Sequence, residues 1–304
     1  MTAQEITLRI EEHFGSGWKN SGTDGFQAGK PTDPVTGIAT AWTPSLDVLQ
    51  QAVKSKQNLV ITVQSPYWPG QGGGGGGGRA SSRVPSAGPN GGRAAKGGGR
   101  GAGPLPGLRA ENTDLYQFKK KYIEDHGLIL WRFSENWLSL PTQPRLRGLA
   151  GALGWAKQQD LAASERVSLV GAGVYALPAG RLSGLAAQIK SSLGLRAMRV
   201  LGDPNATVSR VVVRPGYLTV PDALQMVRST KADVVVCGES CEWEVFPFYE
   251  DWVTAGSGKA FIMLGHAASE KPGTLEMAAW IKALVSEVPV SAILSEEPFS
   301  LGVA

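Results

Sequence analysis

The sequence predicts an α/β protein of two lobes, with mixed sheets flanked by helices. Helical patterns alternate with short apolar runs through most of the chain, as they do when helices pack on the faces of a sheet. The runs Val234–Cys237 and Phe261–Leu264 each end in a glycine followed by polar residues. Buried strands end in this way when functional groups stand at their carboxyl ends. A helix, a buried strand and a polar tip also follow one another between Pro44 and Trp68, and this repetition predicts two lobes that face each other.

Length and composition leave room for one large domain or two of ordinary size. The 304 residues are 42% hydrophobic, which suffices for a core. No apolar run approaches the ~20 residues that a membrane-spanning helix needs. The N-terminus has acids among its apolar residues, which is typical of an amphipathic helix and not of a signal peptide. We therefore expect a cytoplasmic protein without membrane contacts, with export through a missing or removed signal as the alternative.

The first elements follow the N-terminal helix. A helix is predicted from Pro44 to about Lys54, and Asn58–Val63 has the composition of a buried strand. The strand ends in the polar tip Gln64–Trp68. We assign residues 1–69 to the first part of an N-terminal α/β lobe.

Residues 70–108 form a low-complexity insertion. Seven consecutive glycines are followed by Gly, Ala, Arg and Pro residues, which cannot bury enough apolar surface to fold. Six basic residues and no acid lie between Gly70 and Ala110, so the remaining chain has 24 basic and 26 acidic residues. The insertion resembles Gly/Arg-rich segments that touch RNA, but it lacks interleaved aromatics and repeated Arg-Gly-Gly units. We expect a disordered linker that is dispensable for stability, with RNA binding as the alternative.

The remaining elements fall into a middle α/β segment, 109–205, and a C-terminal lobe, 206–304. The predicted helices are Asp114–His126, Leu146–Gln159, Leu182–Leu193, Pro221–Thr230 and Thr274–Val285. The predicted strands before the two glycine-ended runs are Leu128–Trp131, Val167–Val170, Arg196–Val200 and Val208–Val213. A GxGxxA stretch spans Gly171–Ala176, but Pro178 stands where a nucleotide-binding helix would run and no acid follows at the expected ~20-residue distance. We therefore expect no dinucleotide site there.

His266 and Glu270 are the strongest candidates for a functional site. They are four residues apart, so that a helical turn places an imidazole and a carboxylate on one face, a common way to hold a divalent metal. The alternative is a helix start that Ser269 caps and in which Glu270 meets the helix dipole. Two cysteines, Cys237 and Cys241, form no disulfide framework and no zinc-binding pattern, and we interpret them as buried structural thiols.

Six stretches in order resemble the NIF-three-like dinuclear-metal-centre family, whose members are also known as GTP cyclohydrolase I type 2 homologues. They are FQAGKPTDPVTGIATAWTPSLDVLQQAV, NLVITVQSPYW, LILWRFSENW with LRGLAGALGW, LGDPNATVSRVVVRPG, ADVVVCGESCEWE and KAFIMLGHAASEKPG. The resemblance covers nearly all of the chain except 70–108. It implies a two-lobed fold with two metals between the lobes, an assembly that is often a ring-shaped hexamer, and an activity on an unknown small molecule. From the residues themselves we expect neither a nucleic-acid partner nor a membrane partner.

The resemblance also implies a ligand set, which this chain has largely lost. The family's C-terminal His and Glu correspond to His266 and Glu270, and both are intact. The first-lobe His-His or His-Glu corresponds to Gln64 and Ser65, which are poor metal donors. The middle pair corresponds to Ser134 and Leu138, and Leu138 cannot bind a metal. The Glu-Trp-Glu of one family branch survives as Glu242-Trp243-Glu244. We expect a divalent metal (Zn, Mn or Fe), if present, to be substoichiometric.

Four functions follow as hypotheses. The first is a degenerate, non-catalytic member that serves as a scaffold or binding protein. The second is a metal-dependent hydrolase of the cyclohydrolase or phosphoester type that works through His266, Glu270 and a carboxylate from Glu239 or Glu242, with a nearby glutamate such as Glu242 as base. The weak helpers at the metal would be Glu135, Glu239, Glu242 and Gln64. The third is a serine hydrolase with Ser240, Asp251 and His266, although Glu242 stands where the nucleophile turn needs a small residue. The fourth is RNA binding through the insertion, which would weaken steeply with salt.

Overall fold

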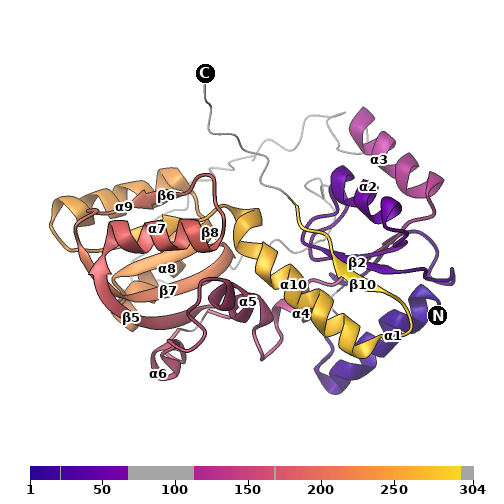
Figure 1. Cartoon of the computed structure of the whole chain (residues 1–304), viewed down its shortest axis with the longest axis horizontal. Coiled ribbons are helices and arrows are strands. Elements are labelled where there is room, and N and C mark those ends of the chain that lie inside the picture. The colour runs from indigo at the N-terminus through magenta and orange to yellow at the C-terminus, as the bar shows by residue number, and fades with distance from the viewer. Residues whose placement is uncertain (21, 68–112, 168, 296–304) are drawn as a thin grey trace, which may run out of the picture.

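A computed structural model of the protein describes residues 1–20, 22–67, 113–167 and 169–295. These residues fold into two α/β lobes, each built on a five-stranded mixed sheet, and helix α10 (His266–Leu284) crosses between them (Figure 1). The predicted class, two α/β lobes with mixed sheets flanked by helices, is confirmed. The predicted disorder and dispensability of 70–108 concern residues outside the described part of the chain.

The first lobe contains the N-terminus and one returning strand from the far end of the chain. Its sheet has the order β1-β4-β3-β2-β10, with β1 antiparallel to β4 and the other neighbours parallel. The strands are β1 (Gly25–Ala28), β2 (Ile38–Ala41), β3 (Leu59–Thr62), β4 (Ile129–Arg132) and β10 (Val290–Ala292). The helices of this lobe are α1 (Ala3–Phe14), α2 (Leu46–Lys54), α3 (Asp114–Asp125) and α4 (Glu135–Leu138), with a 3-10 turn η1 (Gly15–Gly17).

The second lobe is continuous in sequence. Its sheet has the order β5-β7-β8-β9-β6, with β7, β8 and β9 parallel and the two edge strands antiparallel to their neighbours. The strands are β5 (Gly173–Arg181), β6 (Arg199–Leu201), β7 (Thr207–Tyr217), β8 (Val234–Glu239) and β9 (Ala260–Met263). The helices are α5 (Pro144–Ala152), α6 (Leu161–Ser164), α7 (Leu182–Ser192), α8 (Val220–Thr230) and α9 (Glu242–Thr254).

Short sequence signals explain where several helices begin. Thr2 and Glu5 form a capping box at α1, because each side chain accepts a hydrogen bond from the backbone of the other. The side chains of Ser45, Thr113 and Thr219 accept backbone N–H groups at the starts of α2, α3 and α8. Each such cap satisfies a donor that the first helical turn leaves unpaired.

Helix α10 joins the lobes because it packs on both. It leaves the carboxyl end of β9 in the second sheet and leads to β10 in the first sheet. On the first lobe, Trp280 contacts an aromatic cluster that includes Phe14, Phe133 and Trp137. The hydroxyl of Thr40 in β2 donates to the carbonyl of Thr274. Helix α10 thus contacts the first lobe through its middle and its second half, while its first residues follow β9 of the second lobe.

Three predicted elements differ from the structure. The predicted strand Val167–Val170 is wrong: Gly171 turns the chain with a φ of 79°, and strand β5 begins only at Gly173. The helix predicted from Leu146 to Gln159 ends at Ala152, because Gly154 adopts a left-handed conformation with a φ of 75°. The helix predicted from Thr274 begins eight residues earlier, at His266, and contains Pro272.

Two further features of the chain escaped the sequence pattern. Helix α9 was not predicted, and Pro247 in its interior argues locally against a helix. The strands of the predicted middle segment are divided between the lobes, since β4 joins the first sheet while β5 and β6 join the second. The segment boundaries at 69, 108 and 205 stay a prediction.

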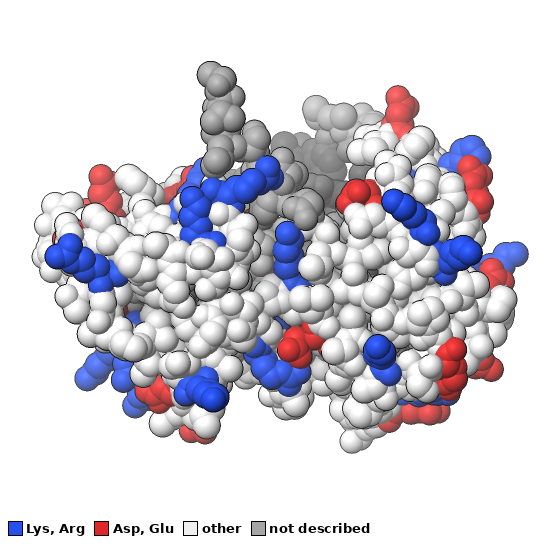
Figure 2. Space-filling view, in the orientation of Figure 1, with Lys and Arg blue, Asp and Glu red and all other residues white. Residues whose placement is uncertain are grey.

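Surface charges of both signs are mixed. In Figure 2, Lys and Arg side chains lie over both lobes with Asp and Glu among them, and uncharged residues cover most of this face. No helix in the described ranges is long and apolar enough to cross a bilayer.

Candidate functional site

His266 and Glu239 meet at the carboxyl ends of two neighbouring strands. Glu239 ends β8, and β9 leads through Gly265, with a φ of 94°, into His266, the first residue of α10. The Nδ1 atom of His266 lies 2.8 Å from Oε1 of Glu239. Because a carboxylate only accepts hydrogen bonds, Nδ1 carries the hydrogen and donates it. The other ring nitrogen, Nε2, is buried and has no hydrogen-bond partner among the described residues.

Glu270 lies one helical turn after His266 and is fully buried. Its carboxylate binds the guanidinium of Arg145, from α5, with both oxygens. Nε of Arg145 donates to Oε2 at 2.8 Å, and Nη2 donates to Oε1. Nη2 also donates to the carbonyl of Pro215 at 3.2 Å, and the guanidinium carbon lies 5.0 Å from the centre of the Trp42 ring. The buried negative charge is therefore neutralised by a side chain of the protein.

A second arginine lies beside this pair. Burial lowers the pKa of Arg214, and the nearby cation of Arg145 lowers it further. Its Nη1 donates to the carbonyl of Tyr217, while Nε is buried and without a partner in the described part of the chain.

Glycines allow the backbone to approach the ion pair. Gly216, near the end of β7, has a φ of 77°, and a Cβ there would stand 2.6 Å from Oε1 of Glu270. The N–H of Gly216 donates to the hydroxyl of Ser269 at 3.0 Å, and that hydroxyl donates to the carbonyl of His266. Ser269 is thus inside α10 and bonded to β7, so the alternative in which Ser269 caps the helix is wrong.

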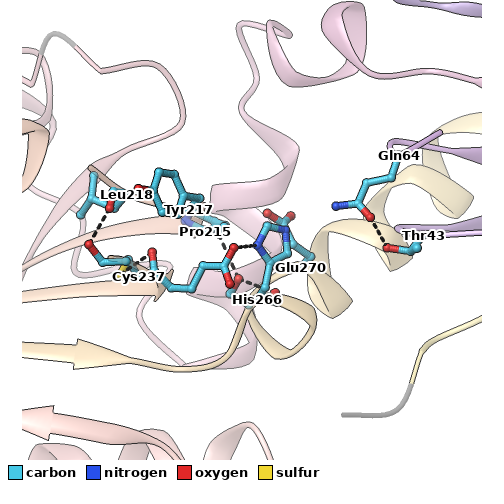
Figure 3. Close-up of polar contacts among 12 residues, drawn as sticks. Thr43, Gln64, Pro215, Tyr217, Leu218, Cys237, His266 and Glu270 are labelled. Atoms are coloured by element: carbon cyan, nitrogen blue, oxygen red, sulfur yellow. Dashed lines mark hydrogen bonds and ion pairs between the residues drawn. The ribbon is translucent and has the colours of Figure 1, made fainter. Parts of the chain in front are cut away.

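Gln64 faces the pair from the first lobe. Figure 3 shows His266 and Glu270 together, with Gln64 and Thr43 opposite them. The Gln64 Oε1 atom accepts a hydrogen bond from the hydroxyl of Thr43 at 2.6 Å. The backbone N–H of Gln64 donates to the backbone carbonyl of Trp42. The Trp42 ring is 5.5 Å from the ring of His266. The predicted positions Gln64 and His266 therefore belong to one neighbourhood between the lobes, whereas the hydroxyl of Ser65 contacts Gln27 of β1.

Ser134 and Leu138 have contacts of a different kind. The carboxylate of Asp24 accepts the backbone N–H groups of Ser134, Glu135 and Asn136, at 2.6 to 2.9 Å, and so caps the short helix α4. Leu138 packs against the aromatic core of the first lobe. Asp24 was missed by sequence reasoning, because its partners lie more than a hundred residues away.

Glu239, and not Glu242, is the acid in contact with His266. Glu242 pairs with Arg199 of the edge strand β6, next to Trp243, which is 77% exposed. The contacts of the serine-hydrolase candidates are also different from those of a triad, since the hydroxyl of Ser240 donates to the carbonyl of Leu218 and Nδ1 of His266 faces Glu239 instead of Asp251. Burial raises the pKa of the Cys237 thiol, as expected of a structural cysteine. The prediction of a buried thiol is wrong for Cys241, which is half-buried.

The described residues of this neighbourhood differ in how they could serve a metal. His266 suits a metal, because a histidine ligand usually donates its other ring nitrogen to a carboxylate, as it does here to Glu239. Glu270 already has a cationic partner, because the guanidinium of Arg145 contacts both of its oxygens. Within the described ranges, no three His, Cys, Asp or Glu side chains gather to hold an ion. The predicted substoichiometric metal stays a prediction.

Sequence reasoning identified His266, Glu270, Glu239 and Gln64 but missed Arg145, Arg214 and Trp42. A buried glutamate signals that a cation must be near, but the chain has 30 Lys and Arg residues and no local pattern selects Arg145.

Comparisons with known proteins identify the family and the fold. The family model of Duf34/NIF3 (NGG1p interacting factor 3) matches residues 147–298, half of the chain. A search of curated proteins finds no match. Among solved structures, the fold is similar to that of the Staphylococcus aureus hypothetical protein SA1388, with a TM-score of 0.67 and 19% identity over 99% of both chains.

Two further solved structures share the fold. The Bacillus cereus protein related to NIF3 has a TM-score of 0.67 and 14% identity over 99% of each chain. Reduced HcgD from Methanocaldococcus jannaschii has a TM-score of 0.60 and 16% identity, over 97% of this chain and 98% of that one. At these identities the likeness shows a common fold.

Proposed function

Because this chain belongs to the Duf34/NIF3 family, we propose that it is a non-catalytic member that serves as a binding protein or scaffold. Its site between the lobes is organised by an internal ion pair and not by a dinuclear metal centre. A metal-dependent hydrolase needs an ion with about three protein ligands and an open position for water or substrate. Without such an ion, the protein has no metal with which to activate a water molecule.

The bidentate pair of Glu270 with Arg145 is the observation that supports this proposal most strongly. Glu270 lies one turn after His266 on α10 and is fully buried. A buried charge persists only with a partner, and Arg145 is that partner. The loss of strong donors at Gln64 and Ser65 supports the same conclusion.

Metal analysis of the whole protein tests the proposal. The protein is purified without chelator and its Zn, Mn and Fe are counted by mass spectrometry, with His266→Ala purified in parallel. We expect well below one ion per chain and the same content in the variant. Two ions per chain that disappear in His266→Ala would overturn the proposal. The same preparation, incubated with nucleotides and phosphomonoesters and excess Mn²⁺, is expected to release no more product than the variant does.

The second candidate is a divalent-metal-dependent hydrolase. The orientation of His266 favours it, because Glu239 holds Nδ1 and leaves Nε2 without a partner among the described residues. A single ion on Nε2 would lower the pKa of its bound water, and Glu239 would position the ring. Stoichiometric metal together with Mn²⁺-dependent turnover that His266→Ala abolishes would establish this candidate in place of the first.

A further inference from the structure

The side chain of Arg145 supplies the positive charge of the site. We infer that the Arg145 guanidinium is a tethered replacement for a metal ion, so that a divalent ion binds His266 and Glu270 only after Arg145 is removed. This inference deepens the proposed function and rests on it. It assigns to Arg145 a role that neither the sequence pattern nor the resemblance to other folds indicates.

Glu270 requires a cation whatever its source. Its side chain has no exposed surface, and it lies inside α10. Water cannot solvate a carboxylate in such a position. The two oxygens face one guanidinium edge, with Nε on Oε2 and Nη2 on Oε1, a geometry in which a single planar cation satisfies both. Both oxygens are thus paired with one cation, which neutralises the carboxylate charge.

The guanidinium is held from several sides. The carbonyl of Pro215 accepts a hydrogen bond from Nη2. The guanidinium carbon also lies 5.0 Å from the centre of the Trp42 ring, as in a cation–π contact. Gly273 of α10 brings that helix against α5, since a Cβ there would stand 3.1 Å from the Cα of Arg145. The packing of α5 on α10 thus fixes the backbone of Arg145, and its guanidinium is held in one position beside Glu270.

His266 supplies the second donor once Arg145 is gone. It lies one turn before Glu270 on the same helix, which places both side chains on one face. Glu239 fixes its ring, and Nε2 has no partner in the described part of the chain. Trp42 contacts both the imidazole and the guanidinium, so the two groups adjoin the same spot. Removing the guanidinium leaves a carboxylate and an imidazole, a fitting pair for Mn²⁺ or Zn²⁺.

The test is a gain of metal binding in Arg145→Ala. The full-length protein is titrated with Mn²⁺, and bound ions are counted from the loss of the free Mn²⁺ signal in electron paramagnetic resonance. Thermal unfolding is followed in the same samples. Arg147→Ala is the matched control, because Arg147 also stands on α5 and pairs with Glu276 of α10, but at the surface, with Arg147 54% exposed.

We expect no saturable site in the unmodified protein or in Arg147→Ala. Arg145→Ala should bind one Mn²⁺ per chain and should unfold at a higher temperature with Mn²⁺ than without it. The double variant Arg145→Ala/His266→Ala should bind Mn²⁺ at least tenfold more weakly than Arg145→Ala does. Arg145→Met serves as a second variant, since it keeps an apolar stem beside Trp42 while removing the charge.

Several outcomes would overturn the inference. One is an Mn²⁺ site in the unmodified protein that Glu270→Gln removes. Another is folded Arg145→Ala and Arg145→Met proteins without a site. Should neither variant fold alone, recovery of folded protein only when Mn²⁺ is present during refolding supports the inference, and no recovery overturns it. A metal-free unmodified protein whose variants gain nothing refutes this inference and leaves the proposed function intact. Two ions in the unmodified protein would refute both.

Discussion

His266 and Glu239 stand at the ends of adjacent parallel strands, and Nδ1 of the imidazole lies 2.8 Å from Oε1 of the carboxylate. The two residues are 27 positions apart, and the pairing of β8 with β9 brings them together. The carboxylate determines which ring nitrogen carries the hydrogen, and so leaves the lone pair on Nε2. This relationship decides what His266 can bind.

The first prediction concerns that tautomer. In the unmodified protein at a pH where the ring is neutral, we expect nitrogen-15 NMR of His266 to show hydrogen on Nδ1. Glu239→Ala should lose this preference, because nothing then selects Nδ1. Glu242→Ala is the matched control, three residues further along, since its carboxylate pairs with Arg199. An unchanged His266 spectrum in Glu239→Ala, or a changed one only in Glu242→Ala, would contradict the prediction.

The second prediction uses two glycines of α5. A Cβ on Gly148 would stand 2.7 Å from the carbonyl oxygen of Pro272 in α10, whereas a Cβ on Gly151 would meet nothing within 4 Å. Gly148→Ala must therefore push α5 from α10 and should destabilise the protein by about 1–3 kcal/mol. Gly151→Ala should instead stabilise it by up to ~1 kcal/mol, because alanine favours the helix.

Urea unfolding of both variants against the unmodified protein measures these free energies. The pair is well matched, since both residues are helical glycines of one short helix. Equal stabilities for the two variants would show that the close approach of α5 and α10, on which the position of Arg145 depends, is not as tight as described.

The third prediction concerns pH. Burial by itself would raise the pKa of Asp233, but the backbone N–H groups of Arg210 and Ser209 donate to its carboxylate and Lys259 lies 3.6 Å away, so that its pKa is lowered overall. A carboxyl whose pKa is lower in the folded state stabilises the fold above its unfolded pKa of about 3.9. That contribution is lost as the pH falls through the folded pKa.

We therefore expect Asp233→Asn to unfold at a lower temperature than the unmodified protein at pH 6 to 7, and the difference to shrink below about pH 4. Melting temperatures of both proteins across this range provide the measurement. Asp251→Asn, on an exposed position of α9, is the control and should show no such convergence. A difference in melting temperature that widens as the pH falls would contradict the lowered pKa of Asp233.

Local sequence predicted much of the framework because its signals are local. The alternation of apolar runs and helical periods indicated β3, β8 and β9, whose residues are almost all buried. The same pattern wrongly predicted a strand that ends at Val170, which is 63% exposed and lies in a turn. It also missed α9 and the early start of α10, where Pro247 and Pro272 lie inside helices that tertiary packing supports.

By itself, the sequence determined that an imidazole and a carboxylate, His266 and Glu270, follow a strand end four residues apart, a spacing that places both on one face wherever the segment is helical. Only the tertiary structure decided what each of them binds. Arg145 is 125 residues from Glu270 and reaches it because glycines let α5 and α10 pack closely. Which cation neutralises a buried charge depends on which surfaces meet after folding, and such contacts over long sequence distances leave no periodic trace in the chain.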